Sequence, residues 1–229
     1  MLRKSLPMIT IVLLLFLLQS CAQKPEQGLL KRYFHAVSLN DVTTMSTIAL
    51  EPVAMEAMSW KIVKASEEKI NPASLPELDK LEKDYKKKLE DHVGPTVDAD
   101  DALYAAKEKL RTARTRAARR AAQKEVEEAQ VKFDEEREIH RQLQRNYNEA
   151  KAAAAREEEI SSFSLGAGEL PNIREMKGEV HAKEVEVMIQ TGSGAKNYNF
   201  WLRKYDLSDE TLGRHFRGRW IIVVIEPLS

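Results

Sequence analysis

The stretch that decides the fold runs from Thr96 to Leu165 and reads TVDADDALYAAKEKLRTARTRAARRAAQKEVEEAQVKFDEEREIHRQLQRNYNEAKAAAAREEEISSFSL. It contains neither Gly nor Pro, and about sixty of its residues are typical of helix. At about 1.5 Å per residue, one unbroken helix of this length would extend on the order of 90–100 Å, more than twice the diameter of a small domain. The sequence therefore predicts that the protein contains a helical rod.

The charges of the rod are segregated along the chain, with basic residues dominant at 107–124 and acidic residues dominant at 125–138. Two geometries fit this pattern. A continuous helix would form i,i+4 charge pairs along one side, whereas a reversal near Ala121-Ala122 would place the basic arm beside the acidic arm. Because the segment around Ala121 contains no turn residue and alanine is the best helix former, we favour the continuous helix and keep the reversal as the alternative.

The basic half of the rod holds a possible interaction patch of five arginines, namely Arg111, Arg114, Arg116, Arg119 and Arg120. An Arg-rich helical face can bind nucleic acid or anionic lipid. The lack of interleaved aromatic residues, the adjacent acidic segment and the formal net charge of zero argue against nucleic acid. The simplest interpretation is a solvated face or an internal charge match. We expect no nucleic-acid partner, and a protein partner or self-association through the rod.

A separate helix is predicted before the rod, from about Ser74 to His92. Apolar residues recur there at helical spacing, and Ser74 with Glu77 has the spacing of a capping box. The segment 93–96 contains Gly94 and Pro95 and therefore predicts a helix stop and a turn before the rod begins.

The N-terminus has the pattern of an export signal. A basic start precedes an apolar run from Pro7 to Leu18, which is too short for a comfortable transmembrane helix. Leu18-Gln19-Ser20-Cys21 follows at once and resembles the lipobox of bacterial lipoproteins. This resemblance implies cleavage between Ser20 and Cys21, a lipid on Cys21 that anchors the chain to the membrane and, because Ala22 is not Asp, an outer-membrane location facing the periplasm. Cys21 is the only cysteine, so an intramolecular disulfide is impossible.

A compact core is predicted from the two ends of the chain, because all three tryptophans lie outside the rod. The first end contains an amphipathic helix around Tyr33 and Phe34, a short helix capped by Asn40 or Asp41, and a strand that would bury Met58, Trp60 and Ile62 before a break at Asn71-Pro72. The helix is defined by the apolar positions Leu29, Leu30, Tyr33, Phe34 and Val37.

After a predicted loop at Ser161–Pro171, the second end contains three predicted strands, at 178–190, 196–205 and 215–226. The alternation of the first strand slips at Lys183-Glu184, which predicts a bulge, and Thr191–Gly194 predicts a hairpin turn. Together these strands predict a curved antiparallel meander.

The order helix, short helix, strand, helical insertion and three strands resembles the NTF2-like (cystatin-like) α+β cone of small envelope lipoproteins. The resemblance is carried by Arg32-Tyr33-Phe34-His35-Ala36 with Asn40-Asp41 and Met45, and by Gly218-Arg219-Trp220-Ile221-Ile222. It implies an α+β fold in which an NTF2-like cone is interrupted by an inserted α-helical hairpin or coiled-coil rod. The implied domains are a signal peptide (1–20), a tether (21–27), the cone in two parts (28–70 and 166–229) and the insertion (71–165).

NTF2-like enzymes place an acid/base pair inside the cone. The candidates here are His35, His181, His215, Asp41 and Asp206, and none forms a recognisable constellation in the sequence. The chain has no Gly-rich phosphate loop, no nucleophile elbow and no cysteine nucleophile, and His140 has no second ligand at metal spacing.

We therefore expect no catalytic residue, no metal and no cofactor. The expected function is that of a lipid-anchored binding or scaffolding protein of the cell envelope, which uses the rod as an interaction or spacer element. The alternative is a small-molecule-binding or enzymatic cone.

Overall fold

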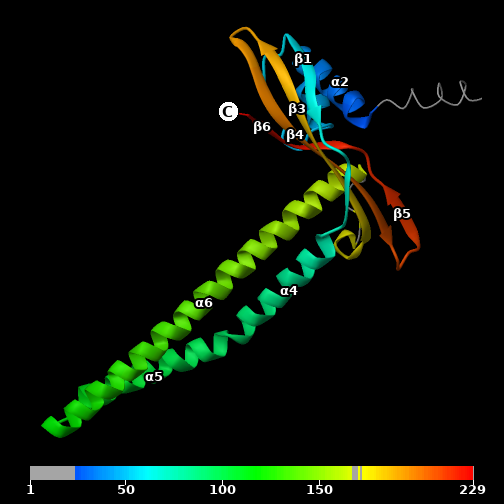
Figure 1. The fold of residues 1–229 in the computed structure, drawn as a ribbon. Coiled ribbons are helices and arrows are strands. Elements are labelled where there is room, and N and C mark those ends of the chain that lie inside the picture. The colour runs from blue at the N-terminus through cyan, green and yellow to red at the C-terminus, as the bar shows by residue number, and fades with distance from the viewer. Residues whose placement is uncertain (1–23, 167–169, 171, 229) are drawn as a thin grey trace, which may run out of the picture.

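The structure, a computed structural model, describes residues 24–166, 170 and 172–228. These residues form a body, in which helices pack on an antiparallel sheet, and a helical hairpin that projects from one end of the body (Figure 1). The mixed α+β class predicted from the sequence is confirmed. The predicted signal peptide, its cleavage position at Ser20 and the lipidation residue Cys21 lie outside the described residues.

The hairpin contains α4 (Leu75–Asp91), α5 (Val93–Thr112) and α6 (Arg116–Leu165). α4 and α5 run in succession along α6, with one break at His92 between them (Figure 1). α4 has the predicted position, although the side chain of Ser74 makes no capping hydrogen bond. The predicted end of this helix near His92 is confirmed, since α4 ends at Asp91. The turn predicted over 93–96 is wrong, because Gly94 and Pro95 lie in the first turn of α5. Proline is tolerated there, since the first N–H groups of a helix have no partner within it.

The chain reverses direction at Ala113–Thr115, so the favoured prediction of one continuous helix is wrong and the alternative of a reversal is confirmed. The predicted position near Ala121 is wrong, because that residue lies inside α6. Ala113 has an extended backbone (φ −65°, ψ 119°), which ends α5. The hydroxyl of Thr115 then accepts a hydrogen bond from the backbone N–H of Ala118 at 3.1 Å and caps α6.

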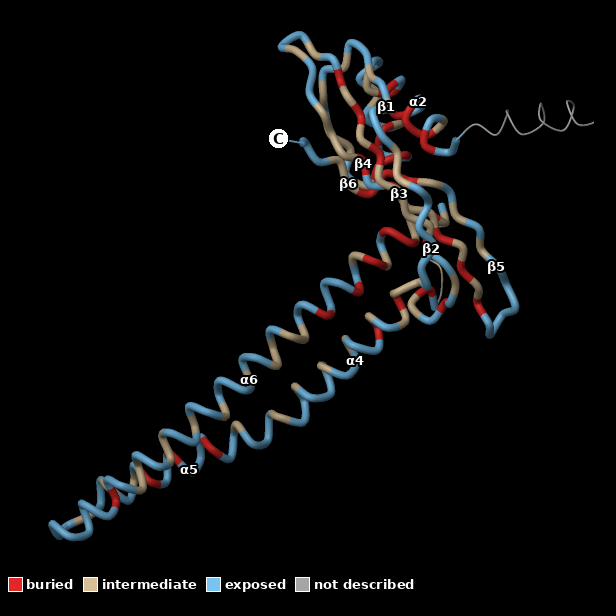
Figure 2. The backbone as a smooth tube through the Cα atoms, in the orientation of Figure 1, coloured by how far each residue is buried: buried red, intermediate tan, exposed pale blue. Residues whose placement is uncertain are grey.

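The hairpin buries a narrow seam of small side chains. Away from its base, the buried residues are Leu103 and five alanines, namely Ala99, Ala106, Ala122, Ala150 and Ala154. Figure 2 shows exposed residues over most of the hairpin, whereas buried residues of the body lie on α2, β3, β4 and β6. Such a seam lets helices approach closely but buries little apolar area per turn. An ion pair adds to it, since Lys109 of α5 lies 2.6 Å from Glu125 of α6.

Within the described residues, six strands form one antiparallel sheet. They are β1 (Ser59–Ala65), β2 (Lys69–Pro72), β3 (Lys177–Thr191), β4 (Gly194–Asp209), β5 (Arg214–Arg217) and β6 (Ile221–Pro227). β3 and β4 form a long central ribbon joined by the predicted turn; β1 and β2 pair with β3, and β5 and β6 pair with β4. The break predicted at Asn71-Pro72 is instead the end of an edge strand, where proline is tolerated. The single strand predicted at 215–226 is divided into β5 and β6.

Helix α2 (Pro25–Ser38) covers one face of the sheet, as the apolar spacing predicted. Its buried Tyr33 and Phe34 make edge-on and tilted contacts with other rings of this core. Trp60 of β1 stacks on Phe34, with ring centroids 4.8 Å apart. Met58, which was predicted to share this buried face, is 76% exposed.

The central ribbon is covered on opposite faces at its two ends. Near α2, Val185 of β3 and Phe200 of β4 point into the first core. Near the hairpin base, Val180 of β3 and Tyr205 of β4 point into a second core on the opposite face, which α4 and α6 also enter. The bulge predicted at Lys183-Glu184 is therefore wrong. β3 and β4 keep one register throughout, and the alternation changes because the covered face changes.

A buried joint fixes the end of α6 to the sheet. The loop predicted to begin at Ser161 is helical to the end of α6. The hydroxyl of Ser164 donates a hydrogen bond to the backbone oxygen of Arg219 (2.8 Å) and accepts one from the backbone N–H of Tyr205 (3.1 Å). A Cβ at position 218 would lie 2.5 Å from both Ser164 Oγ and the backbone oxygen of Tyr205. Only Gly218 fits this close approach.

Candidate interaction surfaces and titratable clusters

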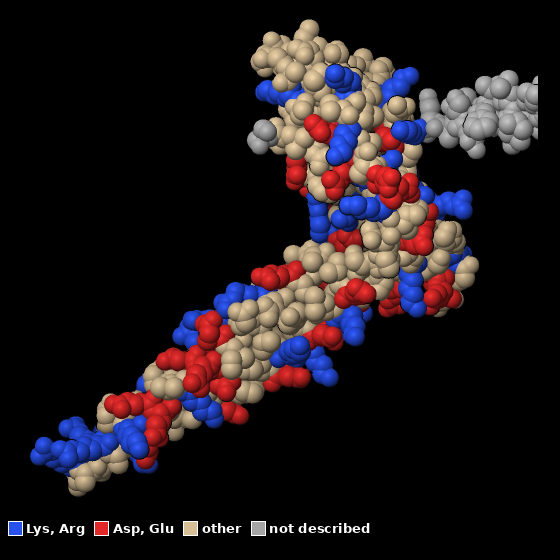
Figure 3. All heavy atoms as spheres, viewed as in Figure 1, with Lys and Arg blue, Asp and Glu red and all other residues tan. Residues whose placement is uncertain are grey.

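The structure gathers the predicted arginine patch at the far end of the hairpin, where Figure 3 shows a dense group of basic side chains. Arg111 lies in the last turn of α5, Arg114 lies in the connection between the helices, and Arg116, Arg119 and Arg120 lie in the first turns of α6. All five are exposed. We call these five residues the tip cluster. The sequence named its members, but their meeting at one end depends on the turn at 113–115.

Most of the charge in the tip cluster is not neutralised within the chain. Residues 107–125 contain eight basic and two acidic side chains. The two acidic residues are already paired, Glu108 with Arg111 at 2.8 Å and Glu125 with Lys109 at 2.6 Å. The other four arginines have no carboxylate within 4.0 Å among the described residues. The tip is therefore a strongly positive surface.

An acidic band lies directly behind the tip on α6. It contains Glu125, Glu127, Glu128, Asp134, Glu135, Glu136 and Glu138. Only Lys132 and Arg137 are basic within the range 125–138. In Figure 3 the acidic side chains follow the basic tip along the hairpin. Some are neutralised locally, since Lys124 lies 3.5 Å from Glu128 and Arg145 lies 2.9 Å from Glu138. The hairpin thus changes sign along its length.

A shallow alanine-lined groove runs between α5 and α6 in the same region. Its floor is Ala102, Ala105, Ala106 and Ala129, and its rim is Lys109, Glu125, Glu128 and Lys132. Small side chains on a helical surface permit a further helix to approach closely, and a rim of both signs can pair with charges on that helix.

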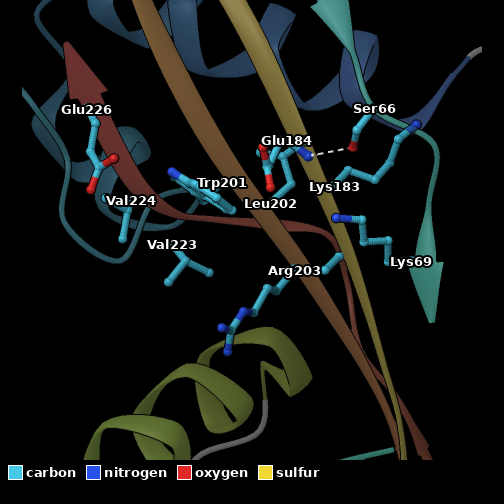
Figure 4. A pocket seen from close by; sticks show the side chains of 11 residues that line it. Ser66, Lys69, Lys183, Glu184, Trp201, Leu202, Arg203, Val223, Val224 and Glu226 are labelled. Atoms are coloured by element: carbon cyan, nitrogen blue, oxygen red, sulfur yellow. Dashed lines mark hydrogen bonds between the residues drawn. The ribbon is translucent and has the colours of Figure 1, made fainter. Parts of the chain in front are cut away.

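A small depression lies on the face of the sheet opposite α2, between the outer strands and the base of α6 (Figure 4). Its volume is about 290 Å³, and Trp201, Val223 and Val224 are among its apolar lining residues. Two of its cations are occupied by structural ion pairs. Arg203 lies 3.0 Å from Glu157, and Lys183 lies 2.7 Å from the buried Glu26.

Some of the polar residues around the depression serve to fix the chain. The backbone N–H of Glu184 donates to the hydroxyl of Ser66 at 2.9 Å, as the dashed line in Figure 4 marks. Tyr205 donates to Glu157 at 2.8 Å. Burial, reinforced by the negative charge of Glu157, raises the pKa of the Tyr205 hydroxyl. Glu157 thus connects α6 to β4, and Ser66 connects the segment after β1 to β3.

Two of the acid/base candidates meet in space. His181 Nε2 lies 3.4 Å from Asp206 Oδ2, and its Nδ1 lies 2.5 Å from Glu68 Oε1. Burial acts to raise the pKa of Asp206, but the hydrogen bond and positive charge of Lys204, 2.9 Å away, outweigh it and hold this pKa below its usual value. Sequence reasoning missed Glu68, because only the pairing of β2 with β3 brings it to His181.

In this cluster His181 is held by carboxylates and has no hydrogen-bonded nucleophile beside it among the described residues. Two carboxylates can orient an imidazole, but among the described residues no hydroxyl or thiol makes a hydrogen bond to His181. The other three candidates have local roles. Asp41 caps α3 (Val42–Ser46) by accepting from the N–H of Thr44 at 3.0 Å, His215 contacts Ser208, and His35 is exposed.

A second histidine cluster lies at the break between α4 and α5. His92 Nε2 is 3.0 Å from Glu136 Oε2, and the rings of His92 and His140 are 6.0 Å apart. No second His or Cys lies at ligand spacing from His140 in the sequence, whereas the hairpin brings His92 near it from across the seam. Within residues 24–166, 170 and 172–228, no group of three His, Cys, Asp or Glu side chains is arranged to hold a metal ion.

Comparisons with known proteins place no relative beside this chain: no family model, no curated protein and no solved structure matches it. None of the described helices combines the length and apolar character needed to cross a membrane. The candidate surfaces are therefore interpreted from their own chemistry.

Proposed function

We propose that this chain is a non-catalytic, lipid-anchored protein of the bacterial cell envelope, in which the helical hairpin serves as spacer and interaction element. The observation that carries the proposal is the hairpin itself. α6 has 50 residues, which corresponds to about 75 Å of helix. Its seam is thin away from the base, and its far end presents unneutralised arginines. A projection of this length contributes little to the core of the body, so its length is better explained by reach.

Within this proposal, the body is an NTF2-like cone made of residues 28–70 and 166–229, and residues 71–165 are an insertion. The proposal is supported by the packing of α2 on one face of the curved sheet. The space between them holds aromatic side chains, including Tyr33, Phe34 and Phe200, and the ion pair of Glu26 with Lys183. Filling of this kind favours a structural body over the alternative of a ligand-binding or enzymatic cone.

The proposed membrane anchor of the chain is a lipid on Cys21, which would hold the protein at the outer membrane, facing the periplasm. Helix α2 begins at Pro25, only a few residues after this cysteine, so the body would lie close to the membrane surface. α2 lies toward the end of the body away from the hairpin (Figure 1), so the hairpin would extend away from the anchor.

The alanine-lined groove is the surface on which a protein partner, or a second copy of the chain, would pack. A photo-crosslinking residue at the exposed Ala105 should give a discrete adduct in intact cells. The matched position is Ala152, which is also exposed on the hairpin but lies outside the groove, and it should give none.

The anchor is tested in the same cells. Cys21→Ala should release the protein from the membrane fraction and remove the Ala105 adduct. Unchanged fractionation would contradict the anchor, and equal adducts from both alanines would contradict the groove.

A further inference from the structure

The tip cluster lacks the aromatic and large apolar anchors that are typical of a protein-binding surface. Protein interfaces draw most of their binding energy from aromatic and other large anchors that enter pockets. No aromatic residue occurs between Tyr104 and Phe133, and the exposed residues from 111 to 121 are only Arg, Thr and Ala. Attraction at the tip is therefore electrostatic, and it fits a surface that offers many negative charges and no pocket.

We infer that the tip cluster binds the phosphate headgroups of an anionic phospholipid bilayer, on a surface other than the one that holds the lipid of Cys21. The inference rests on the proposed function for the anchor and for the hairpin as spacer. Guanidinium groups match phosphate oxygens in a two-pronged geometry, and clustered basic residues are attracted to anionic membranes. The contact residues are the four arginines that have no carboxylate partner among the described residues, namely Arg114, Arg116, Arg119 and Arg120.

The acidic band sets the orientation of this contact. If the hairpin lay flat on an anionic membrane, the carboxylates from Glu125 to Glu138 would be brought against like charge. Only the end of the hairpin, where residues 107–125 carry an excess of six positive charges from eight basic and two acidic side chains, is attracted. The hairpin therefore meets the membrane end-on and spans a gap on the order of 70 Å between two surfaces.

The contact is peripheral and sensitive to salt. The tip exposes no large apolar residue between 111 and 121 that could enter the acyl region. Exposed charges are screened beyond about 10 Å at 0.1 M salt. Proteins that bind single-stranded nucleic acid stack its bases on aromatic side chains, and the tip has none. Nucleic acid therefore fits the tip less well than a phospholipid surface.

A two-vesicle capture experiment tests the inference on the full-length chain. The thiol of Cys21, the only one in the chain, is coupled to maleimide lipid in neutral phosphatidylcholine donor vesicles. Acceptor vesicles contain phosphatidylcholine alone or with phosphatidylglycerol, and their co-sedimentation with the donors is measured at low and high salt. We expect capture of the anionic acceptors only, and its loss at high salt.

Two variants locate the contact. Replacing Arg114, Arg116, Arg119 and Arg120 with Gln should weaken capture on the order of 600-fold, since each basic residue near an anionic surface contributes about 5-fold. The same four residues replaced with Lys keep the charge and should remain within about 5-fold of the native chain. A matched control replaces four exposed lysines of the hairpin away from the tip, which we call the shaft, with Gln. These are Lys80, Lys86, Lys87 and Lys151, and their replacement should leave vesicle capture unchanged.

Absent capture by the native chain, or equal losses from the tip and shaft variants, would overturn the inference. So would capture of neutral and anionic acceptors alike, or a loss on Arg-to-Lys exchange as large as that of the Gln variant. Because chemical coupling replaces the natural lipid, these failures are distinct from failure of the anchor, which the fractionation of Cys21→Ala measures. If the native chain captured no vesicles and a photo-crosslinking residue placed in the tip cluster gave an adduct to an acidic protein, the arginines would be assigned to a protein partner instead.

Discussion

The body and the hairpin of this chain are packed in opposite ways. The body buries large side chains, such as Tyr33 and Phe200, between α2 and the sheet. Away from its base, the hairpin buries mainly alanines and Leu103. Because the free energy of apolar burial scales with area, the body depends on a few large contacts, whereas the hairpin depends on helix propensity and many small ones. The two regions should therefore respond very differently to single substitutions.

The largest effect is expected in the first core. Phe200→Ala should lower the free energy of unfolding by about 3–5 kcal/mol, because Phe200 is 0% exposed and its loss leaves a cavity among aromatic rings. Chemical denaturation followed by tryptophan fluorescence measures this change, since all three tryptophans lie outside the hairpin. Lys196→Ala, an exposed position of the same strand, should change stability by less than about 0.5 kcal/mol. Equal effects at both positions would contradict the assignment of this core.

The joint between the two regions comes next. Gly218→Ala should cost about 2–3 kcal/mol, because its Cβ would lie 2.5 Å from Ser164 Oγ and from a backbone oxygen. Gly192→Ala is the control, since a Cβ there meets nothing within 4 Å. Differential scanning calorimetry measures both. If the two variants had the same melting temperature, the close contact of α6 with the sheet would be in error.

A smaller and more local effect is expected in the hairpin. Leu103 is 4% exposed in a seam of alanines, so Leu103→Ala should lower the local stability of α5 and α6 by about 2 kcal/mol. Amide hydrogen exchange should accelerate in these helices, while the fluorescence transition of the body stays unchanged. A body transition that shifts by the same amount would show that the two regions unfold as one unit.

The smallest effect is expected at the acid/base candidates and depends on pH. The pKa of Asp206 is lowered in the folded protein, so its stabilising effect is present above about pH 3.9 and is lost as the pH falls through the folded value. Asp206→Asn should therefore cost less than about 1 kcal/mol at neutral pH. Its unfolding curve should merge with that of the native chain in acid. A difference that persists below the folded pKa would assign another role to Asp206.

Local patterns predicted much of this structure, because they report interactions within a few residues. The apolar spacing of α2, the cap at Asp41 and the strand predicted at 196–205 all depend on neighbours in sequence. The position of the reversal was predicted wrongly, near Ala121 instead of Ala113–Thr115. The reason is that its main signal is a single threonine cap within a segment of strong helix formers.

The remaining features depend on contacts between distant residues. The slip at Lys183-Glu184 could not reveal that the ribbon is covered on opposite faces, because which face is covered is decided by α2 and the hairpin base. Glu68 joins His181, and His92 approaches His140, only through pairings more than forty residues apart in the chain. The arginines of the candidate site were named from the sequence, but the exposed end they share follows from the position of the turn.

The two-faced ribbon also has a mechanical consequence. The part of the ribbon around Val180 and Tyr205 is held by the core at the hairpin base, and the part around Val185 and Phe200 is held by α2. A load applied to the tip therefore passes from one core to the other along β3 and β4. Fifteen residue pairs join these two strands in a single register, and a load along the ribbon is shared among them in shear. The hairpin acts on the body as a lever, with its fulcrum where Ser164 and Gly218 meet.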